Sequence, residues 1–473
     1  MEVNYEARIT KAKSWINIWN KRDLTLMGKV TIIKSLIYSQ FSYLAIPLIS
    51  PHSTLIKSIE TLTFNFLWGC KRDKMKREVI KRKIGEGGLG LFDFTEFVIS
   101  LKLTLIKKIM DSKFVHVWKN ILIQQLKFPF NIEISIENAL ALENCKIVND
   151  LLLCYTNWRD RVSAARGGCA NHIVWASNKI TDIGSKMWNE RLITGGVLYL
   201  SHFMNMDNII MTYTQFLDHW KLKTSDISSN VYVNIKMAIR RFNCPTITNR
   251  DITKVGEDVC LLFFKDINGN VKRSINGRLI RNEMKTSNSP NSLPALLAWN
   301  RSIGKHDIDW TEVLNNLFFS ITNNYKLIQF QYKLLMRIST CRYMRYKMNI
   351  VKDTDQCSLC HVALETLEHI FFHCPSTKAF NNKLNAFISD QVDIDFRDPK
   401  MFHFITCNYS NPIVNFVNLA AKWYISKNFQ NSKPLIWDEF LRYIRFILAG
   451  EKQNVRVFLG DILSLPASPH SST

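Results

Sequence analysis

Four residues of metal-ligating type lie close together in the last third of the chain, in the pattern Cys357-x2-Cys360-x8-His369-x4-Cys374. Two cysteines three positions apart can both face one ion from a tight turn, and a histidine with a further cysteine completes a tetrahedral set of ligands. This set suits zinc, and it leaves no open coordination position for a substrate. The expected cofactor is therefore structural Zn²⁺.

The fourth ligand of this pattern has two candidates. His373 lies four residues after His369, so both imidazoles would share one helical face, whereas Cys374 lies five residues after it. We favour Cys374 and keep His373 as the alternative. Free buried cysteines with a core histidine are a second interpretation, and a redox-active Cys-x-x-C pair is a third. The redox pair fits less well, because no strand–turn–helix pattern of the thioredoxin type surrounds it.

Two basic segments are candidates for binding nucleic acid. Residues 71–83 carry eight Lys or Arg against two acids, and such a run can neutralise phosphates. A nuclear-localisation signal or a solvated surface segment would give the same composition. Residues 325–347 carry six Lys or Arg and no acid, interleaved with tyrosines and a phenylalanine. Rings among cations can stack bases, although some of these rings must face a core.

No enzyme motif is recognised in the chain. Gly85-x-Gly87-x-x-Gly90 matches the dinucleotide-binding fingerprint literally, but a cationic run precedes it where a strand is needed, and LFDF follows where a helix should begin. The chain contains no Asp-Asp dipeptide, no Gly-x-Ser-x-Gly elbow and no Walker loop. We therefore assign no catalytic residue.

The composition of the 473 residues describes a basic globular protein. The formal charge is +22, 47% of the residues are hydrophobic and 12% are aromatic, so large cores are expected together with a polyanionic partner. No apolar run is long enough for a membrane span, and the N-terminus has no apolar signal region. With 11 scattered cysteines read as reduced thiols, we expect a nuclear or cytoplasmic protein that is neither secreted nor membrane-bound.

Helical periodicity dominates the two ends of the chain. Apolar residues recur at spacings of three and four from Val30 to Leu44, with Thr25 as N-cap, and again from Leu55 to Phe66, before Gly69. The fold class expected is mostly α, with an irregular α/β centre. The expected segments are a helical bundle (1–70), a basic linker, Gly-rich turn and cationic helix (71–130), an irregular central region (131–300), a basic/aromatic helical segment (301–350), a Cys-Cys-His-Cys zinc knuckle (351–380), C-terminal helices (381–460) and a flexible tail (461–473).

Taken in order, four stretches resemble the C-terminal part of reverse transcriptases from LINE-type non-LTR retrotransposons. Residues 10–48 look like the thumb helices that follow the polymerase palm in that family. Residues 64–94 look like its Trp, basic run and Gly-Gly-Leu-Gly continuation. Residues 337–375 look like its zinc knuckle with the approach to it, and residues 418–444 look like its terminal helices.

The resemblance implies a nucleic-acid-binding fragment without polymerase activity. The family's palm carries an aromatic-Ala-Asp-Asp turn that binds two Mg²⁺ ions, and this chain is expected to begin after the palm and the endonuclease. The alternatives are a subunit that supports a separate palm domain, and a repurposed protein-interaction module. The expected partner is RNA or DNA, contacted by Lys29, Lys71, Arg72, Lys74, Lys76, Arg77, Arg337, Arg342, Tyr343, Arg345 and Tyr346.

Overall fold

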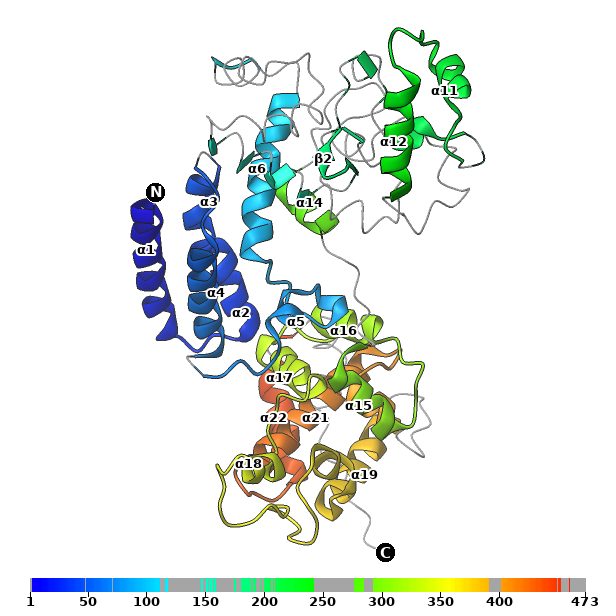
Figure 1. Ribbon diagram of the computed structural model, residues 1–473. Coiled ribbons are helices and arrows are strands. Elements are labelled where there is room, and N and C mark those ends of the chain that lie inside the picture. Colours follow the sequence, from blue (N-terminus) through cyan, green and yellow to red (C-terminus); the bar gives the residue numbers. More distant parts are fainter. Residues whose placement is uncertain are drawn as a thin grey trace, which may run out of the picture. The chain divides into compact units, whose positions relative to one another are not determined.

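A computed structural model of the chain is mostly helical (Figure 1), which confirms the predicted fold class at that level. The chain divides into two compact units, each built from three segments. Unit 1 comprises Met1–Ala12, Ile37–Glu60 and Asp93–Thr286, and unit 2 comprises Lys13–Leu36, Thr61–Phe92 and Ser287–Thr473. The structure describes residues 2–46, 48–69, 71–110, 115–117, 146–147, 150–151, 153–155, 157–158, 174–175, 180–187, 189, 191–192, 197, 200–205, 207, 209–241, 276–284, 292–390, 401–448, 450–451 and 459.

Helices make up nearly all of the regular structure. The α-helices are α1 (Glu2–Asn20), α2 (Leu26–Ile32), α3 (Ser39–Ala45), α4 (Ser53–Trp68), α5 (Arg77–Lys81), α6 (Phe94–Met110), α11 (Tyr213–Trp220), α12 (Ser229–Arg241), α14 (Gly277–Met284), α15 (Pro294–Ile303), α16 (Trp310–Phe319), α17 (Tyr325–Leu335), α18 (Arg342–Lys347), α19 (Pro375–Ser389), α20 (Met401–Thr406), α21 (Pro412–Gln430) and α22 (Trp437–Leu448). The π-helical segments are η1 (Ile33–Ile37) and η6 (His369–His373), and the 3₁₀ segments are η2 (Ile84–Glu86) and η3 (Leu200–Phe203). Strands β1 (Thr181–Asp182) and β2 (Ser185–Lys186) pair antiparallel.

The first helices form where apolar spacing predicted them. The Thr25 hydroxyl accepts a hydrogen bond from the N–H of Gly28, so Thr25 is the N-cap of α2. The predicted single helix is interrupted by the π turn η1, yet its apolar residues Val30 and Phe41 are both buried. Gly69 follows α4 in the left-handed conformation that glycine adopts most easily.

Unit 1 holds its helices together by aromatic packing. The ring of Phe94, at the start of α6, meets the rings of Tyr38 and Phe41 edge-on at 5.2 and 5.3 Å. A second cluster surrounds Phe203, whose ring stacks on that of Phe216 from α11 at 5.1 Å. Such ring pairs stabilise a core beyond the apolar area that they bury.

The glycine-rich turn of unit 2 has a packing role. Gly87 ends η2 with φ +87°, and its carbonyl accepts a hydrogen bond of 3.0 Å from the buried hydroxyl of Tyr332 in α17. A Cβ atom at Gly88 would lie 2.1 Å from the carbonyl oxygen of Arg82, so no larger residue fits there. The loop requires glycines because the backbone folds tightly on itself.

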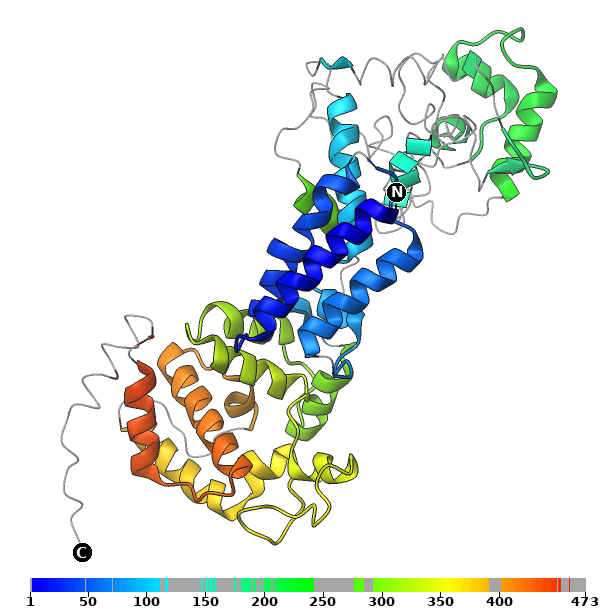
Figure 2. The ribbon, with the colours of Figure 1, turned by 90° about the vertical axis from the view of Figure 1, so that its left-hand side faces the viewer.

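The C-terminal helices of unit 2 pack around α21. This helix is buried along most of its length and contacts α17, α19, α22 and η6. In both ribbon views α21 (orange) lies beside α22 (red) (Figure 1 and Figure 2). The rings of Phe380 and Phe440 fix α19 against α22 at 5.2 Å. This core is the support on which the Cys/His cluster is built.

Parts of the sequence expectations fall outside the described residues. They include most of the segment expected to hold the cationic helix after residue 110, and the tail at 461–473. None of the helices that the structure describes is both long and apolar enough to cross a membrane.

Candidate metal centre and nucleic-acid interface

Cys357 and Cys360 are held by a tight turn. An isolated antiparallel bridge joins Gln356 to Leu364, and the N–H of Cys357 donates to the carbonyl of Ala363 at 2.8 Å. The N–H groups of Leu359 and Cys360 both point at the Sγ atom of Cys357, at 3.4 Å. Backbone donors directed at a sulfur favour its thiolate form, which is the form that binds metal.

His369 and Cys374 are brought together by a π turn. The N–H of Cys374 donates to the carbonyl of His369 at 2.9 Å, which is a bond from residue i+5 to residue i. This wider turn places residue i+5 beside residue i, whereas an α-helix would have placed His373 there. His373 is exposed and lies outside the cluster. The geometry thus selects Cys374, the candidate favoured from the sequence.

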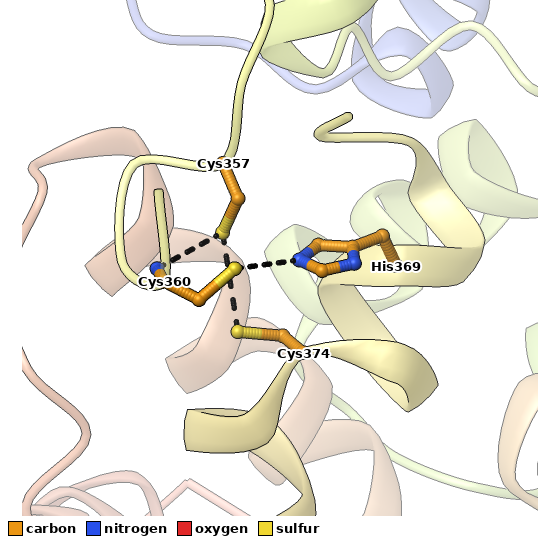
Figure 3. A group of neighbouring side chains, drawn as sticks. All are labelled: Cys357, Cys360, His369 and Cys374. Atoms are coloured by element: carbon orange, nitrogen blue, oxygen red, sulfur yellow. Dashed lines mark hydrogen bonds between the residues drawn. The ribbon is translucent and has the colours of Figure 1, made fainter. Parts of the chain in front are cut away.

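The four ligand atoms converge on one point (Figure 3) and lie within 4.8 Å of one another. The sulfurs of Cys357 and Cys374 are 3.9 Å apart, and the sulfur of Cys360 is 3.3 Å from Nε2 of His369. Tetrahedral zinc with its usual bond lengths gives edges of about 3.8 Å between sulfurs and about 3.6 Å between sulfur and nitrogen. The four residues therefore lie close enough together to bind one metal ion.

Burial and backbone hydrogen bonds together set the pKa values in this cluster. The side chains of Cys357 and Cys374 are fully buried, and burial raises the pKa of the Cys357 thiol to about 12. Burial also raises the pKa of the Cys360 thiol. Hydrogen bonds from the backbone of Val362 and Ala363 outweigh this effect, so the pKa of Cys360 is lowered. Burial also lowers the pKa of His369, so its imidazole is neutral at pH 7, as a metal ligand must be.

Glu365 and Ser358 connect the cluster to its surroundings. The buried carboxylate of Glu365 accepts from the backbone N–H of Ser358 and from that of Arg342, both at 2.9 Å. The hydroxyl of Ser358 donates to the carbonyl of Phe429 at the end of α21, at 3.2 Å. The hydroxyl of Thr366 caps the next turn by accepting from the N–H of His369. These bonds orient the ligand-bearing segments, as groups outside a metal's ligands commonly do.

The basic run begins with four exposed cations. Lys71, Arg72, Lys74 and Lys76 are exposed and make no ion pair with any described residue. Arg77 differs from them, because it pairs with Asp73 at 2.8 Å and lies over the ring of Phe64. The first four are therefore available to phosphates, whereas Arg77 already has intramolecular partners.

Lys29 and Lys74 share their surroundings with a third lysine. Burial lowers the pKa of Lys333 in α17, and charge repulsion from Lys74 and Lys29 lowers it further, while Asp23 acts in the opposite direction. The Lys29 ammonium also donates to the carbonyl of Phe66 at 3.0 Å, at the end of α4. The structure thus groups two predicted residues with Lys333, which the sequence analysis missed because only tertiary packing brings it there.

The residues predicted around α18 fall into two groups. Arg337 pairs with Glu368 and lies over the ring of Trp299, and Arg342 pairs with Asp353. Each of these two predicted phosphate contacts therefore already has an acidic partner within unit 2.

The remaining three residues of this segment are open to solvent to different degrees. Tyr346 is 40% exposed, and Arg345 is partly exposed with no side-chain partner among the described residues. Tyr343 is half-buried, with the ammonium of Lys347 over its ring at 4.5 Å. Tyr346 and Arg345 are thus the better placed for an external ligand.

No protein-family model matches the chain.

Proposed function

We propose that unit 2 binds nucleic acid without catalysing a reaction, and that its Cys/His cluster holds a structural zinc ion. We further propose that the chain is related to the thumb-to-knuckle part of LINE-type reverse transcriptases. The observation that carries the binding proposal is the grouping of Lys29, Lys74 and Lys333. Burial lowers the pKa of Lys333, repulsion from Lys74 and Lys29 lowers it further, and a polyanion would relieve that repulsion.

The charge balance of this surface supports the proposal. Among the described residues, Asp23 opposes the lowering of the Lys333 pKa, and its carboxylate also pairs with Lys326 at 3.2 Å. The exposed cations of residues 71–76 add to this excess of positive charge. Lysines and arginines that neutralise phosphates release counterions from the nucleic acid, and this release drives binding without regard to sequence.

The choice of zinc rests on the chemistry of the donors. Three thiols and one imidazole are soft and borderline ligands, which favour zinc over magnesium or calcium. With four protein ligands the ion would have no position for a substrate or a reactive water. Zinc would therefore fix the ligand-bearing turn against η6 and would supply no chemistry.

Salt-dependent binding tests the proposal. Fluorescence anisotropy with single-stranded RNA, single-stranded DNA and duplex DNA should show binding to all three that weakens steeply between about 50 and 200 mM salt. The variant with Lys71, Arg72, Lys74 and Lys76 changed to Gln should bind each probe more weakly. Absence of binding at the lower salt concentration would refute the proposal and favour a protein-interaction role.

A further inference from the structure

A cavity of about 240 Å³ adjoins the candidate metal centre within unit 2. Its walls come from α17, α18, η6 and the end of α21, and from the turn that carries Cys357. The volume is below the roughly 300–1,000 Å³ of pockets that hold drug-sized ligands. The cavity is therefore suited to a single small group.

One side of the cavity is aromatic. Phe330 of α17, Phe371 of η6 and Phe429 of α21 line it, and all three are almost fully buried. The ring of Phe330 is held edge-on against Trp423 at 5.2 Å, so it is fixed in place before any ligand arrives. An apolar wall of rings accommodates a flat, apolar-faced group.

The other side of the cavity presents unused hydrogen-bonding groups. The side chains of Ser339, Thr340, Ser426, Gln430 and Ser432 line it, and none of them has a side-chain partner among the described residues. By contrast, the two oxygens of Glu365 are already satisfied by backbone N–H groups. The free groups are hydroxyls and one amide, which both donate and accept, as the edge of a nucleobase does.

Arg345 supplies positive charge to the same cavity. Of the two arginines that line it, Arg342 is paired with Asp353, whereas Arg345 has no ion-pair partner in the described parts of the chain. A free guanidinium beside neutral polar groups fits a phosphate attached to the group that enters the cavity. Tyr346, the next residue along α18, offers a partly exposed ring for a neighbouring base.

We propose that this cavity binds one unpaired nucleotide, with the base against the phenylalanines and its phosphate on Arg345. This inference rests on the proposed nucleic-acid binding and adds a preference for single strands. A base within a duplex has its edge paired and both faces stacked, so it cannot enter a cavity of this size. The basic residues 71–76, in contrast, would hold duplex and single strand alike.

Three substitutions at two positions test the cavity. Ser426→Leu fills it and Ser426→Ala leaves it open, while Arg345→Gln removes the cation from the wall and keeps a polar side chain there. We expect Ser426→Leu and Arg345→Gln each to weaken single-stranded RNA binding by about tenfold, with duplex DNA binding unchanged, and Ser426→Ala to change either by less than about threefold. Melting temperature and zinc content of each variant serve as folding controls.

The possible outcomes separate this inference from the proposed function. If the wild-type chain binds both nucleic acids and the folded Ser426→Leu and Arg345→Gln variants bind single strands equally well, the cavity assignment is wrong while the basic surface stands. If the wild-type chain binds no nucleic acid, the proposed function itself fails. A free mononucleotide that competes with RNA for the wild-type chain, and not for Ser426→Leu, would support the assignment and identify a free nucleotide as a further source of the ligand.

Discussion

The carboxylate of Glu365 accepts a 2.9 Å hydrogen bond from the backbone N–H of Ser358, the residue that follows the buried ligand Cys357. The second carboxylate oxygen accepts from the N–H of Arg342 at the start of α18. One buried side chain therefore joins the ligand-bearing turn to the helix that carries Arg345 and Tyr346. Metal affinity and the position of α18 are expected to depend on this carboxylate.

Substitution of Glu365 should weaken metal binding although Glu365 is not a ligand. Loss of a group that orients metal ligands typically reduces affinity by about 10- to 100-fold, and we expect this for Glu365→Ala. Glu365→Gln keeps one acceptor oxygen and should lie between Ala and wild type. Competition with a chromophoric zinc chelator measures the affinity. Glu368→Gln is the control, since Glu368 bonds with Arg337 and Ser302 instead of this turn; equal affinities for all variants would contradict the role given to Glu365.

The stoichiometry and identity of the metal form a second prediction. Purified, dialysed protein should retain about one equivalent of zinc, and Cys374→Ser should lose it with local unfolding, because binding free energy at such sites is folding free energy. His373→Ala should keep the metal, because His373 is exposed and outside the cluster. Elemental analysis by mass spectrometry measures both. Cys407→Ser is a control for cysteine loss elsewhere, and zinc retained by Cys374→Ser would overturn the ligand assignment.

Sequence reasoning succeeded where local spacing decides the structure. The apolar stripe from Val30 to Leu44 and the N-cap at Thr25 depend on neighbours within a few turns, and the structure has both. The choice between Cys374 and His373 was harder, because the periodicity of an α-helix favours the wrong residue. The π turn at His369 decides between the two residues. In this turn the carbonyl of His369 accepts a hydrogen bond from the N–H of Cys374.

Long-range contacts account for what the sequence did not predict. Arg337 and Arg342 look like free cations in a segment without acids, yet each finds an acid further along the chain, Glu368 and Asp353 respectively. Lys333 gave no signal because its cationic neighbours, Lys29 and Lys74, lie far away in the sequence. Pairings of this kind depend on the fold of unit 2 and leave no periodic pattern.

The exposed cations should govern the salt dependence of binding. Changing Lys71, Arg72, Lys74 and Lys76 to Gln should reduce the slope of log affinity against log salt for duplex DNA by up to about 3.6, if each contacts one phosphate. Salt titration by anisotropy measures the slope. The matched control changes four other exposed cations to Gln, which lie in α19, in α22 and in the loop before α22. They are Lys378, Lys383, Lys433 and Arg442. A similar loss of slope in both variants would mean that net charge, and not this surface, drives binding.

Tyr346 and Tyr343 should differ in their contributions. The ring of Tyr346 is 40% exposed, so Tyr346→Ala should weaken single-strand binding by about 1–3 kcal/mol with the salt slope nearly unchanged. Tyr343 is half-buried beneath Lys347, so Tyr343→Ala should mainly lower the melting temperature. Anisotropy and thermal denaturation of both variants test the difference. If Tyr346→Ala loses stability and binding to duplex and single strand together, its ring belongs to the fold and not to a binding surface.

Lys422 in α21 should make the stability of unit 2 depend on pH. Its ammonium is fully buried, donates to the carbonyl of Ile405 and lies 3.0 Å from the sulfur of Cys407. Burial lowers its pKa below the ordinary 10.5, which the unfolded chain retains. The unfolded state therefore binds more protons in the interval between the two pKa values, and the free energy of unfolding contributed by Lys422 rises with pH across that interval.

The substitution Lys422→Met removes this titration while it keeps the length of the side chain. We expect the variant to be at least as stable as wild type at pH 7, because replacing a buried charge with an apolar group of similar volume is often neutral or stabilising. The difference in stability between variant and wild type should shrink as the pH rises toward 10, since wild type gains stability that the variant cannot. Urea denaturation at a series of pH values measures it. Lys427→Met, an exposed lysine on the same helix, should show no such trend. A Lys422→Met protein that is much less stable at pH 7, with the same pH profile as wild type, would show that Lys422 acts through its hydrogen bonds and that its charge costs the fold nothing.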